Sequence, residues 1–184
     1  MNGGVNDDDD ERHLLVAIEL AWQARNHGNH PFGALLVDAD GNVVLRADNT
    51  VVTAPDCTGH AETNLMRMAS GRFSPEFLYG CVLYTSTEPC AMCAGAIYWG
   101  NVRRVVFALS EEELRDISAG IPTTRPWPCP VGRCSHKAST RSRSAVPTSS
   151  TRRGRSTKAS GAEVRSAPSR AVVVTASLLI WLEG

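Results

Sequence analysis

Apolar residues recur every three or four positions near the start of the chain, a spacing typical of a helix with one buried face. This pattern predicts a helix near 11–27. A glycine and a proline follow and end that helix. Two apolar runs, 33–38 and 42–46, then flank Asp40 and Gly41, a dipeptide that is a strong hairpin signal. We therefore expect two paired strands after the first helix.

Helical and strand-like patterns alternate from there to about residue 120. Ser110 precedes three glutamates and predicts a helix start, because serine is a good N-cap and carboxylates suit the helix dipole. The order of helices and strands implies an α/β fold, a three-layer α/β/α sandwich with a mixed central sheet and at least one parallel crossover. The other predicted elements are helices near 59–70 and 90–99 and strands at 79–85 and 103–108.

The length of 184 residues suffices for one domain with a substantial core. The net charge of zero conceals two unlike parts. Residues 1–120 hold 8 arginines and 17 acidic residues, a net charge of −9, whereas residues 121–184 hold 11 basic and 2 acidic residues, a net charge of +9. The second part is rich in serine, threonine and proline, and it has hardly any apolar residue between 132 and 170. We predict a folded domain over 1–120 and a basic, disordered tail over 121–184.

Membrane and secretion signals are not evident in the sequence. The longest apolar stretch, 171–182, is shorter than the ~20 residues that a membrane helix requires. The first residues are acidic and contain no apolar signal-peptide core. Six cysteines in such a chain indicate metal ligands or buried thiols rather than disulfides. We therefore expect a cytoplasmic protein that does not bind membranes.

Two short motifs carry the candidate chemistry. His60 and Glu62 begin one predicted helix, and Pro89, Cys90 and Cys93 begin another. Cysteines three residues apart on a helix face the same way, and a helix N-terminus lowers the pKa of a thiol, which favours the thiolate that a metal binds. With His60 as third ligand, zinc keeps one open position, as in catalytic sites. Glu62 would then take a proton from water and pass it to the substrate.

Other readings of these residues stay open at this point. A C-x-x-C pair alone is often redox-active or structural, and an H-x-E triplet alone means little. A structural site needs a fourth ligand, for which Cys57 and Cys81 are the nearest candidates. Cys81 lies in an apolar run and is expected to be a buried thiol, and we do not expect Cys57 to bind the metal. Cys129, Cys134 and His136 have a loose zinc spacing within the tail, and we expect surface or loop positions for His13, His27 and His30.

Together, the two motifs form the signature of zinc deaminases, H-x-E followed by P-C-x-x-C. The chain resembles the cytidine deaminase superfamily over about 14–114, and most specifically its guanine deaminases and related nucleoside deaminases over 83–99. The segment 31–34 also matches, as does Asn49, which lies 11 residues before His60. The resemblance implies a cytidine deaminase-like fold, a zinc ion and a homodimer.

The resemblance also implies roles for individual residues. His60, Cys90 and Cys93 would bind zinc and Glu62 would carry protons. Substrate contacts would come from Asn49, which hydrogen-bonds the base, and from Phe32, Ala61 and Trp99 around it. As an alternative, Asn49, Phe32 and Trp99 are ordinary core or turn residues.

The expected function is zinc-dependent hydrolytic deamination of a purine base or nucleoside, with guanine as the model substrate. One alternative is a tRNA adenosine deaminase, which shares the P-C-x-x-C-A-G-A segment. The net charge of −9 over 1–120 argues against it, because binding of a polyanion relies on lysine and arginine at the phosphates. A second alternative is an inactive zinc-binding remnant, although Glu62 is intact.

The tail departs from the family pattern. Guanine deaminases continue with a segment that closes the pocket and supplies an acidic residue, whereas this chain has only Glu163 and Glu183 after Asp116. Back-translation of residues 121–137 permits a family-like sequence in another reading frame. We therefore hypothesise a deaminase tail read out of frame; a natural low-complexity tail is the other explanation.

Overall fold

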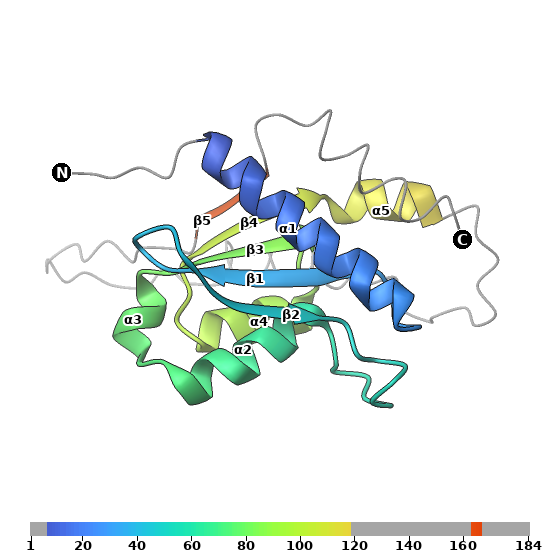
Figure 1. The fold of residues 1–184 in the computed structure, drawn as a ribbon, viewed down its shortest axis with the longest axis horizontal. Coiled ribbons are helices and arrows are strands. Elements are labelled where there is room, and N and C mark those ends of the chain that lie inside the picture. Colours follow the sequence, from blue (N-terminus) through green and yellow to red (C-terminus); the bar gives the residue numbers. More distant parts are fainter. Residues whose placement is uncertain (1–6, 119–162, 167–184) are drawn as a thin grey trace, which may run out of the picture.

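The computed structural model describes residues 7–118 and 163–166, which form a layered α/β fold (Figure 1). The predicted order of helices and strands is confirmed, with one helix and one strand in addition. The helices are α1 (Asp7–Asn26), α2 (Ala61–Arg72), α3 (Pro75–Tyr79), α4 (Ala91–Trp99) and α5 (Glu111–Ser118), and the strands are β1 (Gly33–Val37), β2 (Val43–Asp48), β3 (Val82–Thr87), β4 (Arg104–Leu109) and β5 (Glu163–Ser166).

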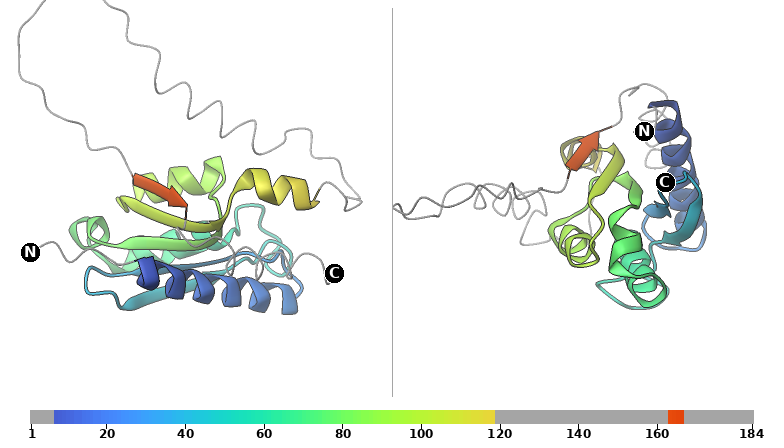
Figure 2. Two further views of the ribbon diagram at one scale, coloured as in Figure 1. Left: turned by 90° about the horizontal axis from the view of Figure 1, so that it is seen from above. Right: turned by 90° about the vertical axis from the view of Figure 1, so that its left-hand side faces the viewer.

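The strands form one mixed sheet in the order β2-β1-β3-β4-β5. β1 pairs antiparallel with both β2 and β3, whereas β3 and β4 are parallel and are joined by α4 as a crossover helix. β3 is therefore held on both sides: Thr85 is opposite Ala34 of β1 and Phe107 of β4. Figure 2 shows the sheet between two helical layers, which confirms the three-layer sandwich.

The face of the sheet under α1 combines an apolar core with a buried polar network. Arg104 donates a hydrogen bond to the Asp10 carboxylate at 2.7 Å, and the Tyr84 hydroxyl donates to the same carboxylate. The His13 ring lies 4.8 Å from the Tyr84 ring and is 3% exposed. Our expectation of a surface or loop position for His13 is therefore wrong. The apolar residues of this face include Leu14, Ala17, Ile18, Ala21, Leu35, Val37 and Val106.

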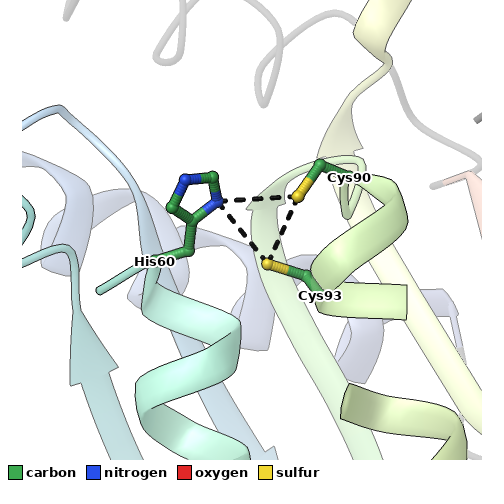
Figure 3. A group of neighbouring side chains, drawn as sticks. All are labelled: His60, Cys90 and Cys93. Carbon is green, nitrogen blue, oxygen red and sulfur yellow. Dashed lines mark hydrogen bonds between the residues drawn. The ribbon is translucent and has the colours of Figure 1, made fainter. Parts of the chain in front are cut away.

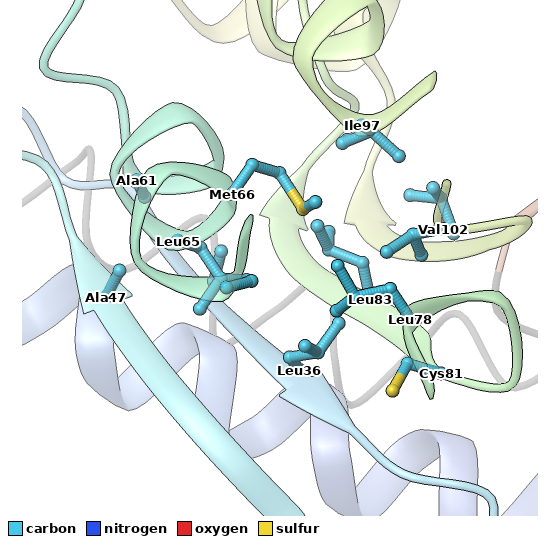
Figure 4. Packing of buried hydrophobic residues seen from close by; sticks show 13 residues of the cluster. Leu36, Ala47, Ala61, Leu65, Met66, Leu78, Cys81, Leu83, Ile97 and Val102 are labelled. Carbon is cyan, nitrogen blue, oxygen red and sulfur yellow. The ribbon is translucent and has the colours of Figure 1, made fainter. Parts of the chain in front are cut away.

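The opposite face is covered by α2, α3 and α4 and has its own apolar core (Figure 4). This core fixes α2 and α4 relative to the sheet, and the N-terminal ends of these two helices hold the candidate metal ligands. The residues packed there include Leu36, Ala61, Leu65, Met66, Leu78, Leu83, Ile97 and Val102.

The start of β1 is locked in place by a close approach to α1. A Cβ atom on Gly33 would lie 2.4 Å from the carbonyl oxygen of Ala17, so only glycine fits there. The backbone amide of Gly33 donates a hydrogen bond to the Ser86 hydroxyl of β3 at 3.2 Å. These two contacts set the position of Phe32, the residue immediately before the strand.

Several boundaries differ from the sequence prediction. α3 was not expected, and β3 begins three residues later than predicted, because residues 75–79 form a short helix capped by Ser74. α4 begins at Ala91 with Cys90 as its N-cap, so Pro89 precedes the helix instead of opening it.

β5 lies within the segment predicted to be a disordered tail, and it pairs parallel with β4. The other tail residues, including Cys129, Cys134 and His136, lie outside the described part of the chain. None of the described helices combines the length and apolar composition that crossing a bilayer requires.

Candidate metal centre and catalytic site

His60, Cys90 and Cys93 converge at one end of the sheet, as predicted (Figure 3). The Nδ1 atom of His60 lies 3.6 Å from the Sγ atom of Cys90 and 3.6 Å from that of Cys93, and the two sulfurs are 3.6 Å apart. His60 comes from the start of α2 and the cysteines from the start of α4. The three ligand atoms thus form a nearly equilateral triangle across two helix ends.

This triangle has the dimensions of a tetrahedral zinc site. Zn–S bonds of about 2.3 Å and Zn–N bonds of about 2.0–2.1 Å imply edges of about 3.5–3.8 Å between ligand atoms in a tetrahedron. Two sulfurs and one imidazole nitrogen are also a donor set that zinc prefers. Among the described residues, His60, Cys90 and Cys93 are the cluster of this kind. The residues therefore fit zinc with three protein ligands.

The side chains of His60 and Cys90 are not used to cap the helices that they begin, so they are available to bind a metal. His60 and Cys90 are the N-caps of α2 and α4, and neither side chain caps its own helix. The hydrogen bond between the two sulfurs lowers the pKa of Cys90 and raises that of Cys93. A separate hydrogen bond, between the His60 ring and the Cys90 sulfur, raises the pKa of His60. Cys90 thus favours the thiolate form before a metal binds, which matches the need of zinc for deprotonated sulfur.

Glu62 lies in the first turn of α2, beside the triad but outside it. Its side chain is 4% exposed, and burial raises the pKa of its carboxyl group. Oε2 lies 3.4 Å from Cys93 Sγ, and Oε1 accepts a hydrogen bond from the Thr85 hydroxyl at 3.2 Å. A buried carboxylate beside the ligand triad is placed to accept a proton and pass it on.

Asn49 and Phe32 are brought to the same end of the sheet. The backbone amide of Asn49 donates to the carbonyl oxygen of Phe32 at 3.0 Å, and the next residue, Thr50, donates from its amide to Gly59, immediately before His60. Asn49 is fully buried, and its Oδ1 accepts a hydrogen bond from the Val51 amide. Its Nδ2 has no hydrogen-bond partner among the described residues.

Sequence reasoning missed the two asparagines that hold the loop after β2. Asn64 of α2 donates from Nδ2 to the Thr50 hydroxyl at 2.9 Å. Asn29 accepts hydrogen bonds from the backbone amides of Val52 and Thr53, each at 3.0 Å. Both residues orient the backbone next to Asn49. A polar residue just after an H-x-E motif, on the helix that carries it, was the available signal for Asn64.

The two remaining predicted substrate contacts, Ala61 and Trp99, differ in their exposure to solvent. Ala61 is fully buried at the first position of α2, whereas Trp99 is 85% exposed at the last position of α4. Trp99 lies six positions after Cys93, which is about 9 Å along a helix axis. Within a single copy of the protein, the Trp99 ring is therefore not beside the triad. A role for Trp99 in the pocket stays a prediction.

The two cysteines considered as a fourth ligand lie outside the triad. Cys81 is buried, as predicted, and burial raises its pKa to about 11. Cys57 is exposed. His27 and His30 are exposed, as predicted.

Curated relatives of the chain are deaminases of several kinds. The chain is 47% identical over 105 residues to a "Probable cytosine deaminase" of Schizosaccharomyces pombe, covering 57% of this chain and 63% of that protein. It is 42% identical over 99 residues to the guanine deaminase of Bacillus subtilis, covering 53% and 63%. It is 36% identical over 107 residues to a tRNA-specific adenosine deaminase of Haemophilus influenzae, covering 58% and 62%. The match thus spans just under two thirds of these relatives.

Solved structures and a family match complete the comparison. The guanine deaminase of Bacillus subtilis aligns with a TM-score of 0.53 and 31% identity, covering 76% of this chain and 97% of that chain. A guanine deaminase from Nitrosomonas europaea has the same fold, with a TM-score of 0.61 and 20% identity, covering 93% and 81%. Residues 7–109, more than half of the chain, match the cytidine and deoxycytidylate deaminase zinc-binding region. The chain therefore belongs to this family of zinc-binding deaminases.

Proposed function

We propose that the protein catalyses the hydrolytic deamination of a free nucleobase of the guanine class. Water replaces the exocyclic amino group, so that base and water become an oxo-base and ammonia. The observation that carries this proposal is the zinc-sized triad with Glu62 beside it and the unpaired amide of Asn49 nearby. The guanine deaminase relative, 42% identical, supports the choice of base.

The residues of the triad would hold zinc and position the reaction. When bound, zinc supplies a nucleophile at neutral pH by lowering the pKa of water to about 7. Glu62 would take one proton from the attacking water and deliver it to a ring nitrogen, and would then carry the second proton of that water, from the new hydroxyl group, to the departing amine. Its carboxylate suits this role because it lies beside the triad and is shielded from bulk water.

Asn49 would recognise the base. A fully buried amide donor without a partner loses stability unless a ligand fills the vacant hydrogen bond. A ring carbonyl of guanine or cytosine is such an acceptor, and adenine lacks one. Phe32, whose carbonyl oxygen holds the Asn49 backbone, and Ala61 are the proposed apolar contacts beside it.

Cytosine is the second candidate substrate, because the relative that is 47% identical is described as a cytosine deaminase. A tRNA substrate is disfavoured by charge: the segment 7–118 contains 8 arginines, no lysine and 17 acidic residues. A polyanion needs a basic surface, and this charge balance opposes one. An inactive remnant is disfavoured by Glu62, which keeps the position and burial that the chemistry requires.

The homodimer also belongs to the proposal. Tyr98 and Trp99 at the end of α4 are 60% and 85% exposed, and Met92 at its start is 37% exposed. An exposed aromatic patch of this kind is typical of protein interfaces. We place the protein in the cytoplasm, because the thiol ligands need a reducing compartment.

A substrate panel tests the proposed function. Zinc-loaded protein is incubated separately with guanine, guanosine, cytosine, adenine, adenosine and a tRNA, and ammonia release is measured. We expect release from guanine above that from all other compounds. Release from cytosine alone would select the second candidate, and release only from tRNA would overturn the proposal.

A further inference from the structure

We propose that the Thr85 hydroxyl is a positioning group for catalysis, which holds the Glu62 carboxylate in the orientation that proton transfer requires. This inference rests on the proposed role of Glu62. Thr85 is fully buried near the end of β3, and its Oγ1 donates a hydrogen bond to Glu62 Oε1 at 3.2 Å. The contact joins the sheet to the first turn of α2, 23 residues earlier in the chain.

The two oxygens of the Glu62 carboxylate have different surroundings. Oε1 is bound by Thr85, whereas Oε2 lies 3.4 Å from Cys93 Sγ and so faces the triad. A hydrogen bond to one oxygen restrains rotation of the carboxylate and keeps the other oxygen directed at the reacting water. Glutamate has several freely rotating side-chain bonds, so without this restraint the carboxylate can adopt other orientations. Catalytic geometry tolerates only small displacements, of about 0.5 Å or 10–20°.

The strand that carries the hydroxyl is itself rigidly held. Thr85 is paired with Ala34 of β1 on one side and with Phe107 of β4 on the other. Its strand, β3, is the middle strand of the sheet (Figure 1). Its hydroxyl therefore presents a fixed point from which to hold Glu62. Valine has nearly the same shape and would suit a buried strand equally well, so packing alone does not explain a hydroxyl here. A buried hydroxyl is costly unless it is hydrogen-bonded, and Glu62 is its partner.

The test compares Thr85→Val, which removes the hydroxyl and keeps the shape, with Thr85→Ser, which keeps the hydroxyl. We expect kcat of the valine variant for guanine to fall on the order of 10- to 100-fold, as for loss of a hydrogen bond to a charged group. KM should change by less than about 3-fold, because Thr85 is not placed against the substrate. The serine variant should recover most of the loss. Zinc content should stay unchanged in both variants, since Thr85 is not among the ligands.

A double-mutant cycle with Glu62→Gln separates this inference from the proposed function. Turnover should not fall further when Thr85→Val is added to Glu62→Gln, because the two groups act through one contact. The same cycle, measured by chemical denaturation of the zinc-free protein, reports the contact without any catalysis. If Thr85→Val does not fold, Thr85→Ala takes its place as the variant without the hydroxyl group and is compared with Thr85→Ser.

The outcomes distinguish the two claims. Full activity of Thr85→Val together with an inactive Glu62→Gln would overturn the positioning role and leave the proposed function intact. Full activity of Glu62→Gln would overturn the proposed function itself. Equal losses of kcat in the valine and serine variants would show that shape matters rather than the hydroxyl, and would also overturn the inference.

Discussion

Replacing Asn49 by alanine should remove recognition of the ring carbonyl of the base. Asn49 is fully buried, and its Nδ2 has no partner in the described structure; in the proposed function this amide donates a hydrogen bond to the base. Without it, the carbonyl is buried without a hydrogen bond, at a cost of about 1–3 kcal/mol. At 1.4 kcal/mol for each factor of ten, kcat/KM for guanine should fall about 5- to 150-fold.

The assay compares guanine with 2-aminopurine, which has the amino group but no ring carbonyl. The unsubstituted protein should prefer guanine by a factor in that range, and Asn49→Ala should abolish the preference. Asn42→Ala is the matched control, because Asn42 lies in the turn between β1 and β2, where its Nδ2 donates a hydrogen bond to Asp38, and its loss should leave the preference unchanged. If Asn49→Ala keeps the preference for guanine, the assignment of Asn49 to the base is wrong.

Three further predictions concern the metal, the face of the sheet under α1 and the tail. Metal analysis after dialysis should find about one zinc ion per chain in the unsubstituted protein and near zero in Cys93→Ala. Cys57 is exposed and outside the triad, so Cys57→Ala should retain its zinc. Full zinc content in Cys93→Ala would remove Cys93 from the ligand set. Burial lowers the pKa of His13, so the stability that its neutral form contributes is fully present above about pH 6.5 and is lost as pH falls through the lower folded-state pKa. The denaturation midpoint should therefore fall less between pH 7 and pH 5 in His13→Phe than in the unsubstituted protein, and equal falls would contradict this reading. Restoring the alternative reading frame after residue 120 should increase turnover. Limited proteolysis of the original chain should leave a core that ends near 115–125. A gene sequence without a frame change would leave the natural low-complexity tail as the explanation.

The zinc triad was predictable because each of its ligands lies in a short sequence motif at the start of a helix. His60 is an N-cap and Cys90 and Cys93 are close in sequence, so a short motif at each helix start is enough to place the ligands. The buried faces of α1 and the paired strands were predictable for a similar reason, since periodicity reports burial directly. Glu62 followed from its distance of two residues from a ligand.

Contacts between distant segments were not predictable. Thr85 meets Glu62 only because β3 lies under the start of α2, and nothing within either segment indicates this. α3 was missed because five residues are too few for a periodic pattern, and its apolar residues merged with those of the next strand. His13 was misassigned because of its polar type. Its spacing of four residues from Ala17 was the signal that it belongs to the buried face.

The central claim is that zinc and Glu62 act together as a hydrolytic deaminase centre. The most direct measurement determines zinc content and ammonia release from guanine in the same preparations of unsubstituted protein and Glu62→Gln. We predict about one zinc per chain in both, because Glu62 lies outside the triad, and a fall in turnover of about 10²–10⁴-fold in the variant. A variant that keeps its zinc and releases ammonia at the rate of the unsubstituted protein would contradict the account.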